Sequence, residues 1–122
     1  MEEFTDKCAC KGSFLDRLTQ PALLAILVKN SCHGFKMMEK LKESGMITGD
    51  SIDPAGLYRT LKRMENAGLV VSYWDTETGS KPKRIYSITE EGMHCLKQWR
   101  CTLNEYRNNI DTILFHIDSQ DK

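Results

Sequence analysis

Three cationic side chains recur at helical spacing in one short stretch of the sequence. Arg59, Lys62 and Arg63 stand at positions i, i+3 and i+4, so a helix would carry all three on one face. Such groups bind phosphate oxygens, and a guanidinium can also donate two hydrogen bonds to the edge of a guanine. We therefore expect Arg59 to contact a base of double-stranded DNA, and Lys62 and Arg63 to hold phosphates.

The surrounding region extends this set of candidate DNA contacts. Residues 54–84 carry six Lys or Arg against three Asp or Glu, although the net charge of the whole chain is zero. A positive excess confined to one region suits a local DNA-facing surface better than a strong non-specific binder. The expected contacts are Ala55, Tyr58, Arg59, Lys62, Arg63, Lys81, Lys83 and Arg84. The simpler alternative is a solvated charged face, with Tyr58 packed on the domain.

A helix followed by a hairpin should position these residues. Asp53 can accept a hydrogen bond from a first-turn N–H group, and Pro54 suits the first helical position. Gly68 can adopt the left-handed conformation that often ends a helix. Alternating apolar residues in 69–74 and 84–88 predict two strands, joined by a turn-rich span. A basic helix that leads into a basic-tipped hairpin is the layout of a winged helix-turn-helix.

Two earlier helices should complete a three-helix core. Residues 21–30 are apolar all round, which is typical of a helix buried on several sides. Apolar residues spaced every three positions from Phe35 predict a second helix to about Glu43. We expect Ile52 to form a short strand that joins the sheet of the hairpin.

The last segment carries a heptad pattern. Between Glu90 and Ile117 the gaps between apolar residues alternate between three and four, at Leu96, Trp99, Leu103, Tyr106, Ile110, Ile113 and Ile117. A helix of this length would be about 40 Å long, more than a small domain can cover. We expect a second copy of the chain to pack on it, giving a homodimer. The alternative is a core helix that lies across its own domain.

The predicted fold class is α+β and mostly helical, a winged helix-turn-helix with a long C-terminal dimerisation helix. Its expected parts are a flexible arm over residues 1–12, a DNA-binding domain over 13–89, and a dimerisation helix with a tail over 90–122. Thr89 is the expected N-cap of the last helix.

The cysteines support a second hypothesis. The chain has five cysteines without the spacing of a disulfide framework, which suits a reducing compartment. Cys8 and Cys10 are candidate ligands for zinc or another transition metal, or a thiol sensor in a metal- or redox-responsive regulator. Their spacing is not Cys-x-x-Cys, and reduced free thiols explain them more simply. We therefore expect no metal and no cofactor.

Other classes of protein lack support in the sequence. It has no apolar run long enough to cross a membrane, and its acidic N-terminus is unlike a signal peptide. We expect a cytoplasmic protein without membrane association. No glycine-rich phosphate loop and no Ser-His-Asp arrangement is visible, so an enzyme is not expected.

Several ordered motifs resemble the PadR family of transcriptional regulators. Residues 21–41 resemble the family's first two helices, with their His-Gly-aromatic junction at His33-Gly34-Phe35. Residues 55–70 resemble its recognition helix, and residues 83–92 its second wing strand and the start of its last helix. The resemblance covers about residues 20–117 and matches the short form of the family, which has a single C-terminal helix.

This resemblance implies a homodimer whose last helix packs against the N-terminal helix of the partner. It also implies a repressor that binds an inverted repeat and, in some members, is released by a small-molecule effector. Trp99 could then line an aromatic effector pocket, although a large core residue is the simpler interpretation. A winged-helix module that binds protein instead of DNA remains a third hypothesis.

Overall fold

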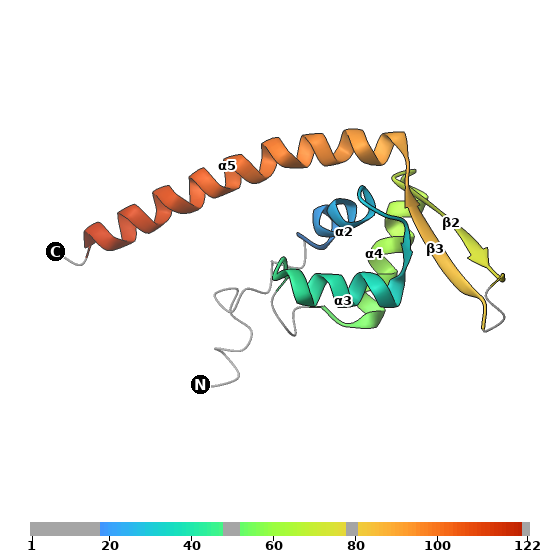
Figure 1. Cartoon of the computed structure of the whole chain (residues 1–122). Coiled ribbons are helices and arrows are strands. Elements are labelled where there is room, and N and C mark those ends of the chain that lie inside the picture. The colour runs from blue at the N-terminus through green and yellow to red at the C-terminus, as the bar shows by residue number, and fades with distance from the viewer. Residues whose placement is uncertain (1–17, 48–51, 78–80, 121–122) are drawn as a thin grey trace.

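Helices and a small sheet pack around one core, from which a long helix extends (Figure 1). The structure is a computed structural model that describes residues 18–47, 52–77 and 81–120. Its elements in chain order are α2 (Thr19–Leu27), β1 (Cys32–His33), α3 (Gly34–Ser44), α4 (Pro54–Asn66), β2 (Val70–Asp75), β3 (Lys83–Ile88) and α5 (Glu90–Gln120). The predicted fold class is confirmed, whereas the expected arm over residues 1–12 lies outside the described residues.

The three short helices form the core through their apolar faces. The side chains of α4 at Leu57, Leu61 and Met64 are at most 1% exposed, as their helical spacing predicts. They pack in one cluster with Leu23 of α2 and Met37 of α3. Burial of α2 is nearly complete around its axis, which explains its uniformly apolar sequence.

Local signals in the sequence fix the ends of α4. Asp53 Oδ1 accepts a hydrogen bond of 2.8 Å from the Gly56 N–H group, and Pro54 occupies the first turn. After the last turn, Gly68 has a φ of 82°, where a side chain would be strained. The predicted start and stop signals are therefore both confirmed.

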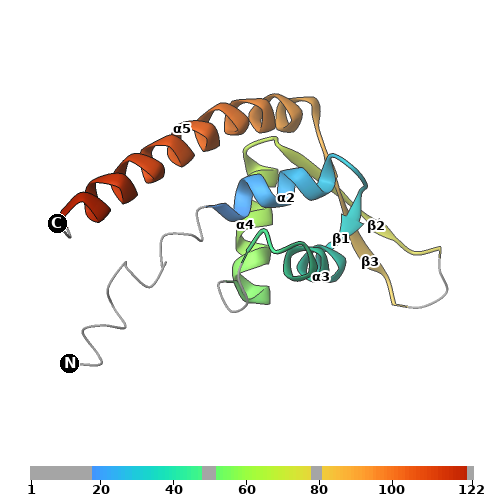
Figure 2. The same cartoon turned by 60° about the vertical axis from the view of Figure 1, so that its left-hand side comes forward.

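The sheet has three antiparallel strands in the order β1-β3-β2 (Figure 2). Its short third strand is Cys32–His33, which pairs with Tyr86 and Ile85, so the prediction that Ile52 forms this strand is wrong. A two-residue strand leaves no periodic signal in the sequence. Ile52 instead packs against the core just before the Asp53 cap, at the position of a hydrophobic staple.

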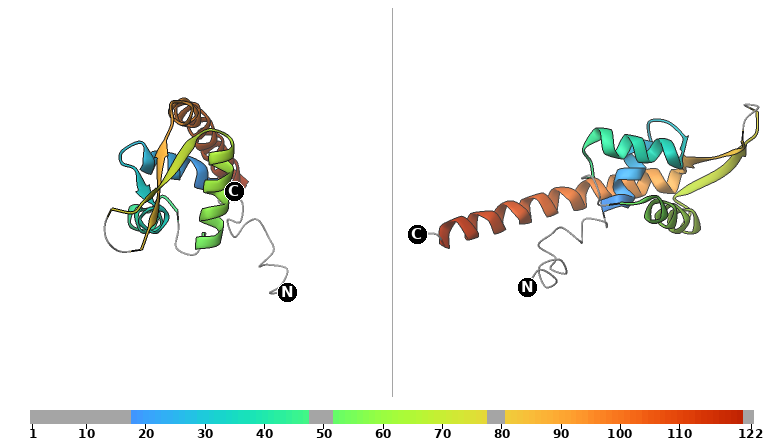
Figure 3. Two further views of the ribbon diagram at one scale, coloured as in Figure 1. Left: turned by 90° about the vertical axis from the view of Figure 1, so that its right-hand side faces the viewer. Right: turned by 90° about the horizontal axis from the view of Figure 1, so that it is seen from below.

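Helix α5 begins at the wing and ends far from the core. Thr89 Oγ1 accepts a hydrogen bond of 3.0 Å from the Gly92 N–H group, which confirms the predicted N-cap. Its first half packs against α2, and Trp99 Nε1 donates a hydrogen bond of 2.8 Å to Gln20 Oε1. Its second half projects beyond the other elements (Figure 3). No helix in the described part of the chain has the length and apolar character needed to cross a membrane.

Candidate nucleic-acid interface

The outer face of α4 presents the cations that the sequence singles out. Arg59, Lys62 and Arg63 are exposed, while the opposite face of the helix is buried. Ala55 is exposed in the first turn of the same helix. Ala55 and Arg59 lie in the N-terminal half of α4, and Lys62 and Arg63 lie in its C-terminal half.

Tyr58 packs on its own domain and is also exposed at the outer surface. Its side chain is 47% exposed, so it belongs to the outer surface. Its ring also lies so close to Gly34, the first residue of α3, that a Cβ atom there would overlap it. The His33-Gly34 junction therefore leaves the space that Tyr58 occupies between α3 and α4.

Two exposed lysine residues lie on the wing near the turn of the hairpin. Lys81 and Lys83 are exposed, and residues 78–80 between the strands lie outside the described residues. Lys83 pairs with Asp75 across the β2–β3 ladder, at the end of the hairpin farthest from α5.

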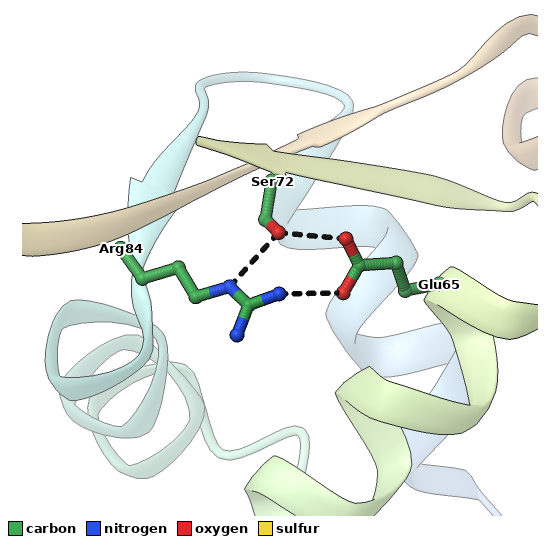
Figure 4. Close-up of polar contacts among 3 residues, drawn as sticks. All are labelled: Glu65, Ser72 and Arg84. Carbon is green, nitrogen blue, oxygen red and sulfur yellow. Dashed lines mark hydrogen bonds and ion pairs between the residues drawn. The ribbon is translucent and has the colours of Figure 1, made fainter. Parts of the chain in front are cut away.

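Arg84 lies beside Lys83 but is held within the protein. Its guanidinium donates a hydrogen bond of 2.9 Å to Ser72 Oγ and forms an ion pair of 3.2 Å with Glu65 (Figure 4). The side chain of Glu65 is 30% exposed and that of Arg84 45% exposed. Arg84 therefore differs from the other expected DNA contacts, because its charge already has a partner.

Two exposed aromatic residues of this surface were not among the predicted contacts. Phe35 at the start of α3 is 67% exposed, and Trp74 of β2 is 62% exposed. Together with His33, Tyr58 and the side chains of β3 they line a hollow of about 500 Å³. The alternating pattern of the strand could have predicted that Trp74 faces outward. That Phe35 lies near Trp74 could be seen only from the fold, because the two residues are far apart in the sequence.

The described cysteines are Cys32, Cys95 and Cys101, all of them free thiols. Within the described ranges no three His, Cys, Asp or Glu side chains are grouped as metal ligands would be, and Cys8 and Cys10 lie outside those ranges. Burial raises the pKa of the Cys32 thiol, and the nearby Lys40 and Lys36 oppose this only in part. Cys32 therefore keeps its proton at neutral pH and is a poor nucleophile or ligand.

The heptad residues of α5 divide into two groups. Leu96 and Trp99 are partly buried against the core of their own chain, and Leu103 is half-buried. The later residues of the pattern are about half exposed, at Tyr106 49%, Ile110 55%, Ile113 57% and Ile117 55%. A groove of about 840 Å³ runs between α2 and the first half of α5, from Met93 to Arg107.

A three-helix core, a two-stranded wing and an outward basic helix define a winged helix-turn-helix protein. Residues 23–98 match the sequence pattern of the transcriptional regulator PadR-like family, and the chain belongs to that family. It is thus a transcriptional regulator by family rather than an enzyme. No curated protein gives a significant match to the sequence.

Solved structures share this fold. A PadR family transcription regulator from Clostridium difficile is 23% identical with a TM-score of 0.69, and the match covers 80% of this chain and 98% of that one. A transcriptional regulator from Clostridium thermocellum is 21% identical with a TM-score of 0.71, covering 81% and 92%. Bacillus subtilis PadR, solved in complex with operator DNA, is 21% identical with a TM-score of 0.60, covering 68% and 46%.

Proposed function

We propose that this protein is a homodimeric repressor that binds an inverted-repeat DNA operator and is released by a small molecule. The observation that carries the DNA-binding role is the face of α4, where Arg59, Lys62 and Arg63 are exposed above a fully buried apolar stripe. The structure of Bacillus subtilis PadR with operator DNA supports the same role for this fold. The proposed contacts are Ala55, Tyr58, Arg59, Lys62 and Arg63 of the helix and Lys81 and Lys83 of the wing.

The exposed half of α5 supports the dimer. Tyr106, Ile110, Ile113 and Ile117 leave an apolar stripe that nothing in the described part of the chain covers. A stripe with heptad spacing is typical of a helix that packs on another helix. The groove between α2 and α5 is lined by Pro21, Ala22, Leu96 and Leu103, so it offers an apolar seat for the exposed half of a partner's α5.

Charges along α5 favour an antiparallel arrangement of the two copies. Arg100, Arg107, Asp111 and Asp118 are separated by seven, four and seven residues, so they share one side of the helix. This side is positive in the first half, where Arg100 and Arg107 line the groove, and negative in the second half. Two copies that run in opposite directions would bring each half beside the opposite charge of its partner.

The effector is proposed to act at the same interface. Trp99 is half-buried where the first half of α5 meets α2, and Leu96 and Arg100 of the same helix segment line the groove that the partner would cover. A small molecule bound between two copies could change the distance between their recognition helices.

A selection experiment tests the DNA-binding role without knowledge of the operator. The purified protein would be incubated with a random duplex library, and bound sequences would be enriched and then measured by gel shift with random DNA as competitor. We expect an inverted repeat whose half-sites are about one helical turn, roughly 34–36 Å, apart. The Arg59→Ala/Lys62→Ala variant is the matched control and should enrich nothing.

The outcomes separate the hypotheses. Enrichment of a motif by the unmodified protein alone would support the repressor, and loss of binding with a chelator would favour a metal-responsive regulator instead. Failure of the unmodified protein to enrich any sequence would contradict the DNA-binding role and favour the protein-binding module.

A further inference from the structure

Three side chains from three elements form a closed hydrogen-bonded loop at the junction of the recognition helix and the wing. Arg84 of β3 donates from Nε to Ser72 Oγ of β2 at 2.9 Å and from Nη2 to Glu65 Oε1 of α4 at 3.2 Å. Ser72 Oγ in turn donates to Glu65 Oε2 at 2.7 Å. Figure 4 shows that the loop bridges the gap between the helix and the two strands.

Aromatic rings hold the guanidinium from the wing side. The Arg84 carbon Cζ lies 5.9 Å from the ring centroid of Trp74 and 5.7 Å from that of Tyr86. These are cation–π distances, and a planar guanidinium with fixed donors suits such a site better than a flexible ammonium group. Arg84 is therefore held by hydrogen bonds on one side and by cation–π contacts on the other.

Glu65 is otherwise hard to explain on this surface. An acid on the helix that faces DNA repels phosphates and weakens binding. Its carboxylate, however, accepts both from Ser72 and from Arg84, so its charge is used inside the loop. The pair adds no net positive charge to the DNA-facing surface, unlike Lys83 beside it.

We propose that Arg84 and Glu65 form a brace that sets the angle between the wing and the recognition helix, and that Arg84 promotes DNA binding through this brace rather than by contacting phosphate. The proposal rests on the proposed DNA-binding function and replaces the sequence-based expectation that Arg84 is a wing contact. Ser72 completes the brace, and Arg84 is its positioning residue.

The two possible roles of Arg84 predict opposite effects of removing Glu65. If Arg84 contacted phosphate, Glu65→Ala would free its charge and leave DNA binding equal or tighter. If the brace positions the wing, Glu65→Ala should weaken binding although it removes a negative charge. We expect the dissociation constant to rise about fivefold, in keeping with the modest free energy of a partly exposed ion pair.

The experiment is a double-mutant cycle on the selected operator, measured by fluorescence anisotropy at several salt concentrations. Glu65→Ala, Arg84→Ala and the double variant should weaken binding by similar factors, because each removes the same brace. The slope of log affinity against log salt should stay as in the unmodified protein. Lys83→Gln, the matched control, should flatten that slope by about 0.9 for each phosphate that the variant no longer neutralises.

Two results would overturn the brace. One is unchanged or tighter binding by Glu65→Ala, and the other is a slope for Arg84→Ala that flattens as it does for Lys83→Gln. Melting temperatures of all variants, measured in parallel, separate a moved wing from a protein that has lost its fold.

Hydrogen exchange tests the brace without DNA, so it still applies if the protein is found not to bind DNA. Hydrogen exchange of the β2 and β3 amide groups should accelerate equally in Glu65→Ala and Arg84→Ala, and not in Lys83→Gln. Unchanged exchange in both variants would contradict the brace whatever the protein binds.

Discussion

At the scale of single residues, the exposed cations of this surface differ in what they can recognise. Arg59 stands in the N-terminal half of α4, and its guanidinium can donate to two acceptors of one guanine at once. Lys83 stands near the tip of the hairpin, where a single ammonium group can meet phosphate but reads no base. The two positions should therefore affect specificity and affinity separately.

Replacing Arg59 with alanine should weaken binding to the cognate site by about 1–3 kcal/mol and relax the preference for one base there. Lys83→Gln should instead weaken cognate and random duplexes by the same factor. Anisotropy titrations with both duplexes measure the two effects. Equal losses from both variants on both duplexes would contradict this division of roles.

Cys32 should be the least reactive of the described cysteines. It is 9% exposed and its pKa is raised by burial, whereas Cys101 is exposed on α5. Iodoacetamide at pH 8 should label Cys101 in the folded protein and Cys32 only after unfolding, as measured by mass spectrometry. Labelling of Cys32 as fast as Cys101 would contradict its protected state.

The raised pKa of Cys32 also predicts how stability depends on pH. Because the thiol ionises at lower pH in the unfolded chain than in the folded protein, the free energy of unfolding should fall as the pH rises above 9.0.

Residues whose partners are close in sequence could be predicted, and those with distant partners could not. Asp53 caps a helix through the N–H group three residues later, so the sequence alone predicts its role. Arg84 meets Glu65 nineteen residues away, and only the packing of the wing on α4 brings them together. The sequence therefore predicts Arg84 as one more free cation of the wing.

At the scale of elements, the start of α5 is fixed by a close approach to the chain that precedes the wing. Gly92 in its first turn lies against the carbonyl group of Leu69 and the side chain of Ile88, and a Cβ atom would overlap both. Thr89 adds a hydrogen bond of 2.6 Å from its hydroxyl group to the Gly68 carbonyl. These contacts attach the helix to the segment just before β2 and to the end of β3.

Gly92→Ala should therefore destabilise the protein by about 1–3 kcal/mol, because backbone atoms must move to admit the methyl group. His94→Ala, at a nearby exposed position of the same helix, is the control and should change stability little. Urea unfolding followed by circular dichroism gives both free energies. A Gly92→Ala variant as stable as the control would show that the junction has more room than its geometry indicates.

The sequence predicts long elements that carry a repeating pattern of apolar residues, but not elements too short to show such a pattern. The helices α3, α4 and α5 all have a repeating apolar pattern over three or more turns. The strand β1 has two residues and no pattern, and its place in the sheet depends on the return of β3 beside it. This is why the sequence favours Ile52, a β-branched residue just before α4, over Cys32–His33 as the third strand.

At the scale of the whole molecule, the proposed dimer depends on the projecting half of α5. This helix of 31 residues is about 46 Å long, and within the described residues its contacts with the core come from the first half, through Cys95, Leu96 and Trp99. Ile110 lies at the centre of the exposed stripe, so a charge there would remain in the interface unpaired.

Ile110→Lys should convert the dimer to a monomer and abolish binding to the full inverted repeat together. Asn108→Lys makes the same charge change on the opposite side of the helix and is the matched control, which should remain dimeric. Light scattering after size-exclusion chromatography measures the mass of each variant. A monomeric Ile110→Lys protein that still binds the full repeat tightly would rule out the proposed dimer, as would an unmodified protein that is itself a monomer.

Only Thr89 separates the last wing strand from α5. No flexible linker therefore lies between the proposed DNA-binding surface and the helix that carries the exposed apolar stripe of the proposed dimer. One residue inserted at this junction would rotate the apolar stripe of α5 by about 100° about the helix axis and shift it by about 1.5 Å along that axis. The junction therefore fixes the direction in which the apolar stripe faces relative to the DNA-binding surface. A single-residue insertion would turn the stripe away from the partner. An insertion at Thr89 should be tolerated only in whole heptads, which restore the rotational phase of the stripe.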